Sequence, residues 1–160
     1  MLKVFIQFIS RLLSSKKPAP LIEIDPIGSL SFDTDEEAWV GSVGFKFGVV
    51  RLCLSGNWRR VGEDGLIRPH AAATEWAEEI ARSPDNFQML AEGFLNEQNG
   101  RTEDFRRFLE KRGRKEFDEI HIYKEDHKPL EGLVSYLSSD GIEIWRIAFH
   151  EKNPCAFYSE

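Results

Sequence analysis

The first third of the chain alternates apolar and polar positions with the period of two that is typical of β-strands. Polar turns separate the alternating stretches, and the most polar of them is the acidic run at residues 33–37. This part of the chain is predicted to form an antiparallel meander. We expect its strands at residues 21–25, 27–32, 39–43 and 45–54, and a glycine-containing loop at residues 55–68.

From residue 69 onward, apolar residues recur every three or four positions, which is the helical period. Pro69 can begin a first helix. Ser83 and Pro84 are the N-cap and first-turn signals of a second helix. Thr102 has the capping position of a third, which Gly113 ends. The middle of the chain therefore predicts three consecutive helices.

The last third returns to the strand period, with a hairpin as its clearest feature. Asp140-Gly141 is a type I′ turn signal. A two-residue loop there places Leu137 opposite Ile144 and Tyr136 opposite Trp145. We expect the face with Tyr136 and Trp145 to pack against the helices, because it is the larger apolar face. The strands are expected at residues 117–123, 130–138, 142–149 and 154–158.

The order strands, helices, strands predicts an α+β fold. We expect a single antiparallel sheet of about five to seven strands, with the helices packed on one face. The repeating strand–helix alternation of a Rossmann domain is absent. Residues 1–20 are interpreted as an N-terminal amphipathic helix and linker, and residues 21–160 as a single α+β domain large enough to bury its own core.

The N-terminal stretch Met1–Leu13 has apolar residues at helical spacing. It is too short and too polar to span a bilayer, and it lacks the uninterrupted apolar core of a signal peptide. The predicted helix packs on its own domain, on a neighbouring protomer, or on a membrane surface or partner through residues 1–17. A cleaved or degenerate signal is the weaker alternative. The predicted location is cytoplasmic, with Cys53 and Cys155 as free thiols, or as one disulfide if the chain is exported.

Charge along the chain is strongly segregated. The 160 residues carry a net charge of −6, which argues against a dedicated nucleic-acid-binding protein. Residues 1–20 hold four basic side chains and no acidic one, whereas residues 21–45 hold six acidic side chains and no basic one. Such blocks form either solvated faces that neutralise one another in the fold or an acidic patch that receives a basic partner.

Motifs that carry chemistry are missing from the sequence. It contains no GxSxG, no P-loop, no GxGxxG and no HExxH. We therefore predict no catalytic residues, no metal site and no cofactor. An alternative remains for Glu119, His121 and His150, which would form an enzyme site without a known motif if neighbouring strands brought them together. The other interpretation is that these are ordinary hydrogen-bonded or surface side chains.

Features suited to contact with a partner are clearer. Four carboxylates crowd the turn at residues 33–37, and a tryptophan in the loop at residues 55–65 stands beside two arginines. Tryptophan and arginine are frequent anchors of protein interfaces. The predicted partner-binding residues are Asp33, Asp35, Glu36, Glu37 and Trp58.

Three segments carry a resemblance to known proteins: residues 27–33 leading to Trp39, residues 102–105, and the strand at residues 118–123. Their layout resembles small uncharacterised bacterial α+β domains found among the immunity proteins of polymorphic toxins. The resemblance implies a protein that occludes a toxin's active site or an essential surface and performs no reaction. An acidic face would suit a basic nuclease toxin.

These observations predict a non-enzymatic protein-binding module, of which an immunity-type inhibitor is the form that the resemblance suggests. Its predicted partner is a protein such as a basic toxin, and not a nucleic acid. The first alternative is a peripheral membrane or assembly protein that uses the N-terminal helix. The second is the enzyme with a site near Glu119, His121 and His150.

Overall fold

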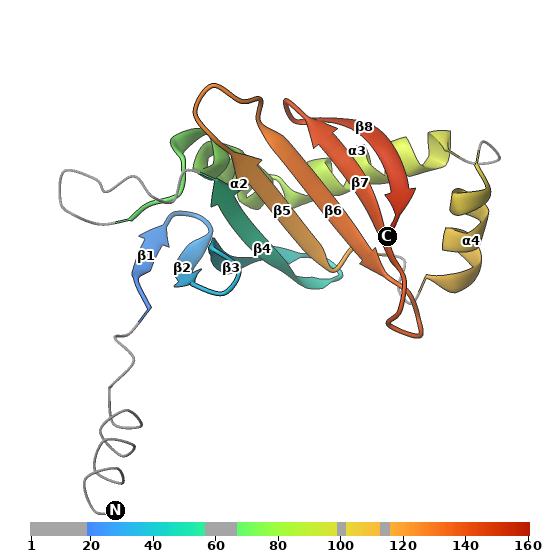
Figure 1. Ribbon diagram of the computed structural model, residues 1–160, viewed down its shortest axis with the longest axis horizontal. Coiled ribbons are helices and arrows are strands. Elements are labelled where there is room, and N and C mark those ends of the chain that lie inside the picture. The colour runs from blue at the N-terminus through green and yellow to red at the C-terminus, as the bar shows by residue number, and fades with distance from the viewer. Residues whose placement is uncertain (1–18, 57–66, 99–101, 113–115) are drawn as a thin grey trace, which may run out of the picture.

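The computed structural model describes residues 19–56, 67–98, 102–112 and 116–160. Four strands come first, then three helices, then four more strands (Figure 1). The first strands are β1 (Leu21–Ile24), β2 (Gly28–Asp33), β3 (Ala38–Phe45) and β4 (Gly48–Gly56). The helices are α2 (Ala71–Arg82), α3 (Pro84–Glu97) and α4 (Glu103–Lys111). The last strands are β5 (Glu119–Lys124), β6 (Glu131–Leu137), β7 (Ile144–His150) and β8 (Asn153–Ser159).

The predicted α+β class is confirmed, and two details of the sheet are corrected. The sheet has eight strands, not five to seven, in the order in which they occur in the chain. All neighbouring strands are antiparallel except β4 and β5, which are parallel. The parallel pair arises because the helices intervene between β4 and β5: they carry the chain back to the end of the sheet where β4 began.

The predicted N-terminal helix falls in residues 1–18 and lies outside the described residues. The first described residues lie just before β1, whose four residues form one edge of the sheet. At the other edge lies β8, the last strand of the chain.

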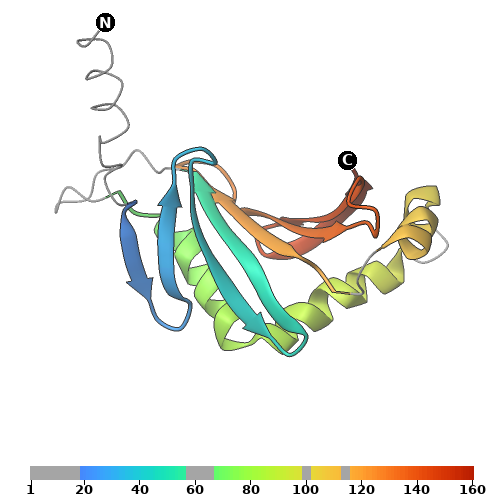
Figure 2. The same cartoon turned by 90° about the horizontal axis from the view of Figure 1, so that it is seen from below.

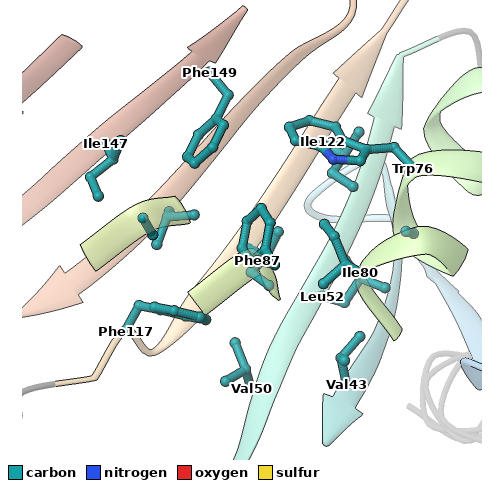
Figure 3. Close-up of a cluster of buried hydrophobic side chains, with 14 of the residues drawn as sticks. Val43, Val50, Leu52, Trp76, Ile80, Phe87, Phe117, Ile122, Ile147 and Phe149 are labelled. Carbon is teal, nitrogen blue, oxygen red and sulfur yellow. The ribbon is translucent and has the colours of Figure 1, made fainter. Parts of the chain in front are cut away.

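The helices cover one face of the sheet (Figure 2). Trp76 and Ile80 of α2 and Phe87 of α3 point into the buried side chains of the strands (Figure 3). Helix α2 packs tightly against β6 at Gly132, where an added Cβ atom would lie 2.5 Å from the Trp76 ring. Gly132 therefore provides the space that the indole occupies. Aromatic side chains continue this core beneath α4, where the Phe108 ring lies 5.3 Å from that of Tyr136 and 5.6 Å from that of Trp145.

Helix starts follow the predicted signals with two differences. Pro84 occupies the first turn of α3, and Thr102 Oγ1 accepts a hydrogen bond from the Phe105 amide at the start of α4. Ser83 precedes α3 but makes no side-chain capping bond. His70, and not Pro69, caps α2, because its Nδ1 accepts from the Ala72 amide at 3.1 Å.

The register of the β6–β7 hairpin is confirmed. Leu137 pairs with Ile144 and Tyr136 with Trp145, whose ring is buried against the helices. The predicted type I′ turn is wrong, because Gly141 has a positive φ of 72° and Asp140 does not. Type I′ requires both. Asp140 instead accepts hydrogen bonds from the Ser138 hydroxyl and the Ile142 amide, which closes a longer loop without shifting the strands.

Candidate functional site on the helix-free face

The face of the sheet opposite the helices is open in the part of the chain that the structure describes, and Figure 1 looks onto it. Because side chains alternate along a strand, the residues between the buried ones point to this face. Paired registers then align them into rows across β4 to β8. The rows contain Arg51, Cys53 and Ser55 of β4, Glu119, His121 and Tyr123 of β5, Leu133 and Ser135 of β6, Arg146, Ala148 and His150 of β7, and Ala156 and Tyr158 of β8.

A hollow of about 520 Å³ lies on this face over β5 to β8. Leu133 of β6 and Ala148 of β7 lie opposite each other within it, and the short side chain of Ala148 leaves space there. Larger side chains stand around this space. The hollow is lined by His121, Tyr123, Glu131, Gly132, Leu133, Ala148, Phe149, His150, Cys155 and Tyr158.

His121 is the most constrained polar side chain of the hollow. Its Nε2 lies 2.7 Å from Ser55 Oγ on the neighbouring parallel strand, within hydrogen-bonding distance. Burial lowers the pKa of His121 below its usual value, and nearby Glu119 only partly opposes this shift. A neutral imidazole in this position can accept the Ser55 hydroxyl proton.

Beside the hollow, Arg51 links two carboxylates on the same face. It forms ion pairs with Glu119 of β5 and, at 2.5 Å, with Glu36 of the β2–β3 turn. These bonds raise the pKa of Arg51, with Glu36 as the larger cause, so the guanidinium remains charged. Cys53 lies two residues along β4 and is only 1% exposed, which raises the pKa of its thiol to about 12. On this half of the face, the Arg51 guanidinium and the Cys53 thiol are therefore both engaged within the fold.

The rim of the hollow at the β5–β6 loop carries charged groups. The Tyr123 hydroxyl donates to Glu125, which also pairs with Lys128 at 2.6 Å. Lys128 Nζ lies 5.9 Å from the centre of the Tyr123 ring, a cation–π distance. Glu131, the first residue of β6, is exposed beside them.

The predicted acidic residues have different roles in the structure. Asp33 Oδ1 accepts hydrogen bonds from the amides of Asp35 and Glu36 at 2.8 and 3.1 Å, which lower the pKa of Asp33. It stabilises the β2–β3 turn, and Glu36 is held by Arg51. Asp35 and Glu37 are exposed on that turn. Trp58, the fifth predicted partner-binding residue, lies outside the described residues.

Of the three residues named for an alternative enzyme site, the structure brings two to the same hollow. His121 and His150 line the same hollow, although they come from β5 and β7. Glu119 is on the same face, but its carboxylate is engaged by Arg51 and does not line the hollow. Reasoning from the sequence missed Ser55, Tyr123 and Tyr158. The period-of-two alternation could have found Tyr123, whereas Ser55 and Tyr158 depend on how the strands pair.

Among the described residues, no group of three or more His, Cys, Asp and Glu side chains is arranged to hold a metal ion. None of the described helices combines the length and the apolar character needed to cross a bilayer. Comparison with protein-family models, with curated proteins and with solved structures found no match to this chain.

Proposed function

We propose that this protein is a non-enzymatic protein-binding module that meets its partner with the helix-free face of the sheet. The partner is a protein with a basic surface. An immunity-type inhibitor, which neutralises a toxin by covering its active site or an essential surface, is the form of this function that the sequence resemblance suggests. The observation that carries the proposal is the hollow over β5 to β8, which is lined by apolar and aromatic side chains and by the carboxylate of Glu131.

Charge supports a basic partner. The described residues that line the hollow include one carboxylate, Glu131, and no lysine or arginine. Two further exposed carboxylates, Asp35 and Glu37, stand on the β2–β3 turn. This turn is at the same end of the sheet as the β5–β6 loop, because β3 begins where β4 and β5 end. Complementary charge steers a basic protein toward that end and fixes its orientation.

Apolar exposure on the same side of the sheet supports a protein partner over a small ion. Val49 on the open face of β4 is 76% exposed, and Ile142 in the β6–β7 loop is 78% exposed. Leu137 lies between them on the open face of β6. Charged groups between these residues and the hollow are paired within the chain, Arg51 with Glu119 and Arg146 with Glu160. A protein could cover them without leaving a charge unpaired.

The test begins with cross-linking in the native host, followed by purification of the cross-linked protein and calorimetry with the full chain. Ala148→Arg fills the hollow with a cationic side chain, and we expect it to weaken binding at least tenfold. Met89→Arg is the matched control, because Met89 is 63% exposed on α3, in the helix layer. It should bind as the wild type does. Equal binding by Ala148→Arg, or loss of binding in Met89→Arg alone, would contradict the proposed face.

Inhibition is tested separately from binding. The product of the adjacent open reading frame is expressed in a heterologous host, with and without this chain. An immunity protein predicts growth arrest that the wild-type chain lifts and Ala148→Arg does not. If the adjacent product is harmless, or toxic regardless of this chain, the inhibitor form of the proposal fails while a binding module remains to be judged by calorimetry.

A second candidate function, the enzyme near Glu119, His121 and His150, is favoured by the short distance between Ser55 Oγ and His121 Nε2. An unprotonated histidine beside a serine hydroxyl is the arrangement of an activated nucleophile. A fluorophosphonate probe, which reacts with activated serines, should then label Ser55 in the wild type but not in His121→Ala. Absence of labelling in the folded wild-type chain would remove this candidate.

A further inference from the structure

The hollow has a composition that selects for a particular kind of group. Its floor is apolar, formed by Leu133 and Ala148, and aromatic rings of Tyr123 and Tyr158 stand on two sides. Among the described residues that line it, Glu131 is the one carboxylate. No ion pair in the described part of the chain engages Glu131, in contrast to Glu119 on the same face, which Arg51 neutralises. A negative charge therefore stands beside apolar and aromatic walls.

The structure already shows how a cation sits at this rim. Lys128 Nζ is placed over the Tyr123 ring and is also paired with Glu125. Lys128 is thus engaged within its own loop, and none of the ion pairs among the described residues joins it to Glu131. The Tyr123 ring thus already holds a cation of this chain, Lys128. Glu131, which lines the hollow, has no cationic partner among the described ion pairs.

We infer that the hollow receives an arginine side chain of the basic partner protein, with Glu131 as its counter-ion and the tyrosine rings as its walls. This inference rests on the proposed function and names the residue by which the partner is anchored. A guanidinium fits better than an ammonium, because it is planar, stacks on aromatic faces and is more weakly hydrated. The apolar floor would leave a strongly hydrated lysine ammonium poorly solvated. Arginine is also among the residues that dominate binding energy at interfaces.

The inference is tested without the partner, by titrating the full isotope-labelled chain with small probes and following backbone amide signals by NMR. N-acetyl-arginine amide should shift the signals of Gly132, Leu133 and Ala148. N-acetyl-citrulline amide has the same shape without the charge and should bind about tenfold more weakly. Glu131→Gln should reduce the affinity for the arginine probe by a similar factor.

The control variant Glu37→Gln removes one carboxylate on the β2–β3 turn, outside the hollow, and should bind the arginine probe as the wild type does. Equal affinity for the citrulline probe, or shifts confined to another surface, would overturn the inference. So would tighter binding of free L-arginine than of the capped probe, which would indicate a metabolite site. A partner whose binding is weakened by Ala148→Arg but not by Glu131→Gln would leave the binding module standing and remove the arginine anchor.

Discussion

Two thiols on the two halves of this protein differ sharply in access to solvent. Cys53 is buried between β3 and β5, whereas Cys155 of β8 is exposed at the hollow. The sequence predicted two free thiols, or one disulfide if the chain is exported, and both cysteines are free in the structure. It could not rank their reactivity, since burial of Cys53 depends on strands that are far apart in the chain.

Cys155 should therefore react selectively with a thiol reagent. At pH 8 the buried Cys53 remains protonated, because burial raises its pKa to about 12. We expect Ellman's reagent to release one equivalent of chromophore from the native chain and two from the chain in urea. Cys155→Ser should abolish the native reaction. Rapid release of two equivalents without denaturant would contradict the described burial of Cys53.

His121 should make stability depend on pH in a defined window. Its folded-state pKa lies below the value of 6.5 expected in the unfolded chain, so acid protonates the unfolded chain first. The free energy of unfolding should fall as the pH drops from 7 to 5, with a slope of at most about 1.4 kcal/mol per pH unit from this group.

Urea unfolding of the wild type and of His121→Gln at several pH values measures this contribution. Glutamine retains a hydrogen-bonding partner for Ser55 but does not titrate. The difference in stability between the two proteins should shift toward the variant as the pH falls below 6.5. A difference independent of pH would show that His121 titrates alike in the folded and unfolded chains.

At the scale of elements, the junction of β4 and β5 is the feature that local patterns did not reveal. Each strand was predicted within a few residues, and the hairpin register was correct, because period and turn chemistry are local signals. The direction of β5 relative to β4 depends instead on three intervening helices. The type I′ turn predicted at Asp140 was also wrong. The Ser138 and Asp140 side chains accept hydrogen bonds from the amides of Ile142 and Glu143, which stabilises a loop longer than two residues.

Gly56 makes the β4–β5 junction sensitive to one added carbon. It has a φ of +123°, and a Cβ there would lie 1.8 Å from the Lys124 carbonyl oxygen of β5. We expect Gly56→Ala to lower the free energy of unfolding by at least about 2 kcal/mol, because both backbone strain and a backbone clash oppose it.

The matched control is Gly44→Ala on the neighbouring strand β3, where a Cβ would meet nothing within 4 Å. Its effect should stay below about 1 kcal/mol in the same urea titration. If the two substitutions lower the free energy of unfolding equally, the close approach of Gly56 to β5 does not constrain the junction.

At the scale of the whole molecule, two four-stranded meanders share one sheet and one helix layer. Helix α2 contacts β3, β4 and β5, and α3 contacts both β3 and β8, so these two helices bridge the two meanders. Neither meander has a helix layer of its own. The chain should therefore unfold as one cooperative unit.

Fluorine NMR of the chain labelled with 5-fluorotryptophan tests this cooperativity. Trp39 of β3 and Trp145 of β7 are both buried and report on different meanders. Their native signals should disappear with the same urea midpoint. A lower midpoint for Trp39 would mean that the first meander unfolds alone and that the bridging helices do not couple the halves.

The pattern of charge along the chain did not locate the hollow. Counting acids along the chain pointed to the turn at residues 33–37, yet Asp33 and Glu36 of that turn are used within the fold. The hollow was not foreseen, because Leu133, Ala148 and Cys155 come together in it from three different strands. Sequence reveals which residues share a strand face, but not which strands become neighbours.

Strand order in this sheet equals strand order in the chain, and this has a consequence for synthesis. As the polypeptide leaves the ribosome, each new strand can add to an edge that already exists, and no earlier strand has to be displaced. The helices emerge after the first meander and can cover it before β5 arrives. The last strand, β8, supplies Cys155 and Tyr158 to the hollow. The proposed binding surface is therefore complete only when β8 has been added to the sheet, so a chain truncated before β8 would lack part of the surface that meets the partner.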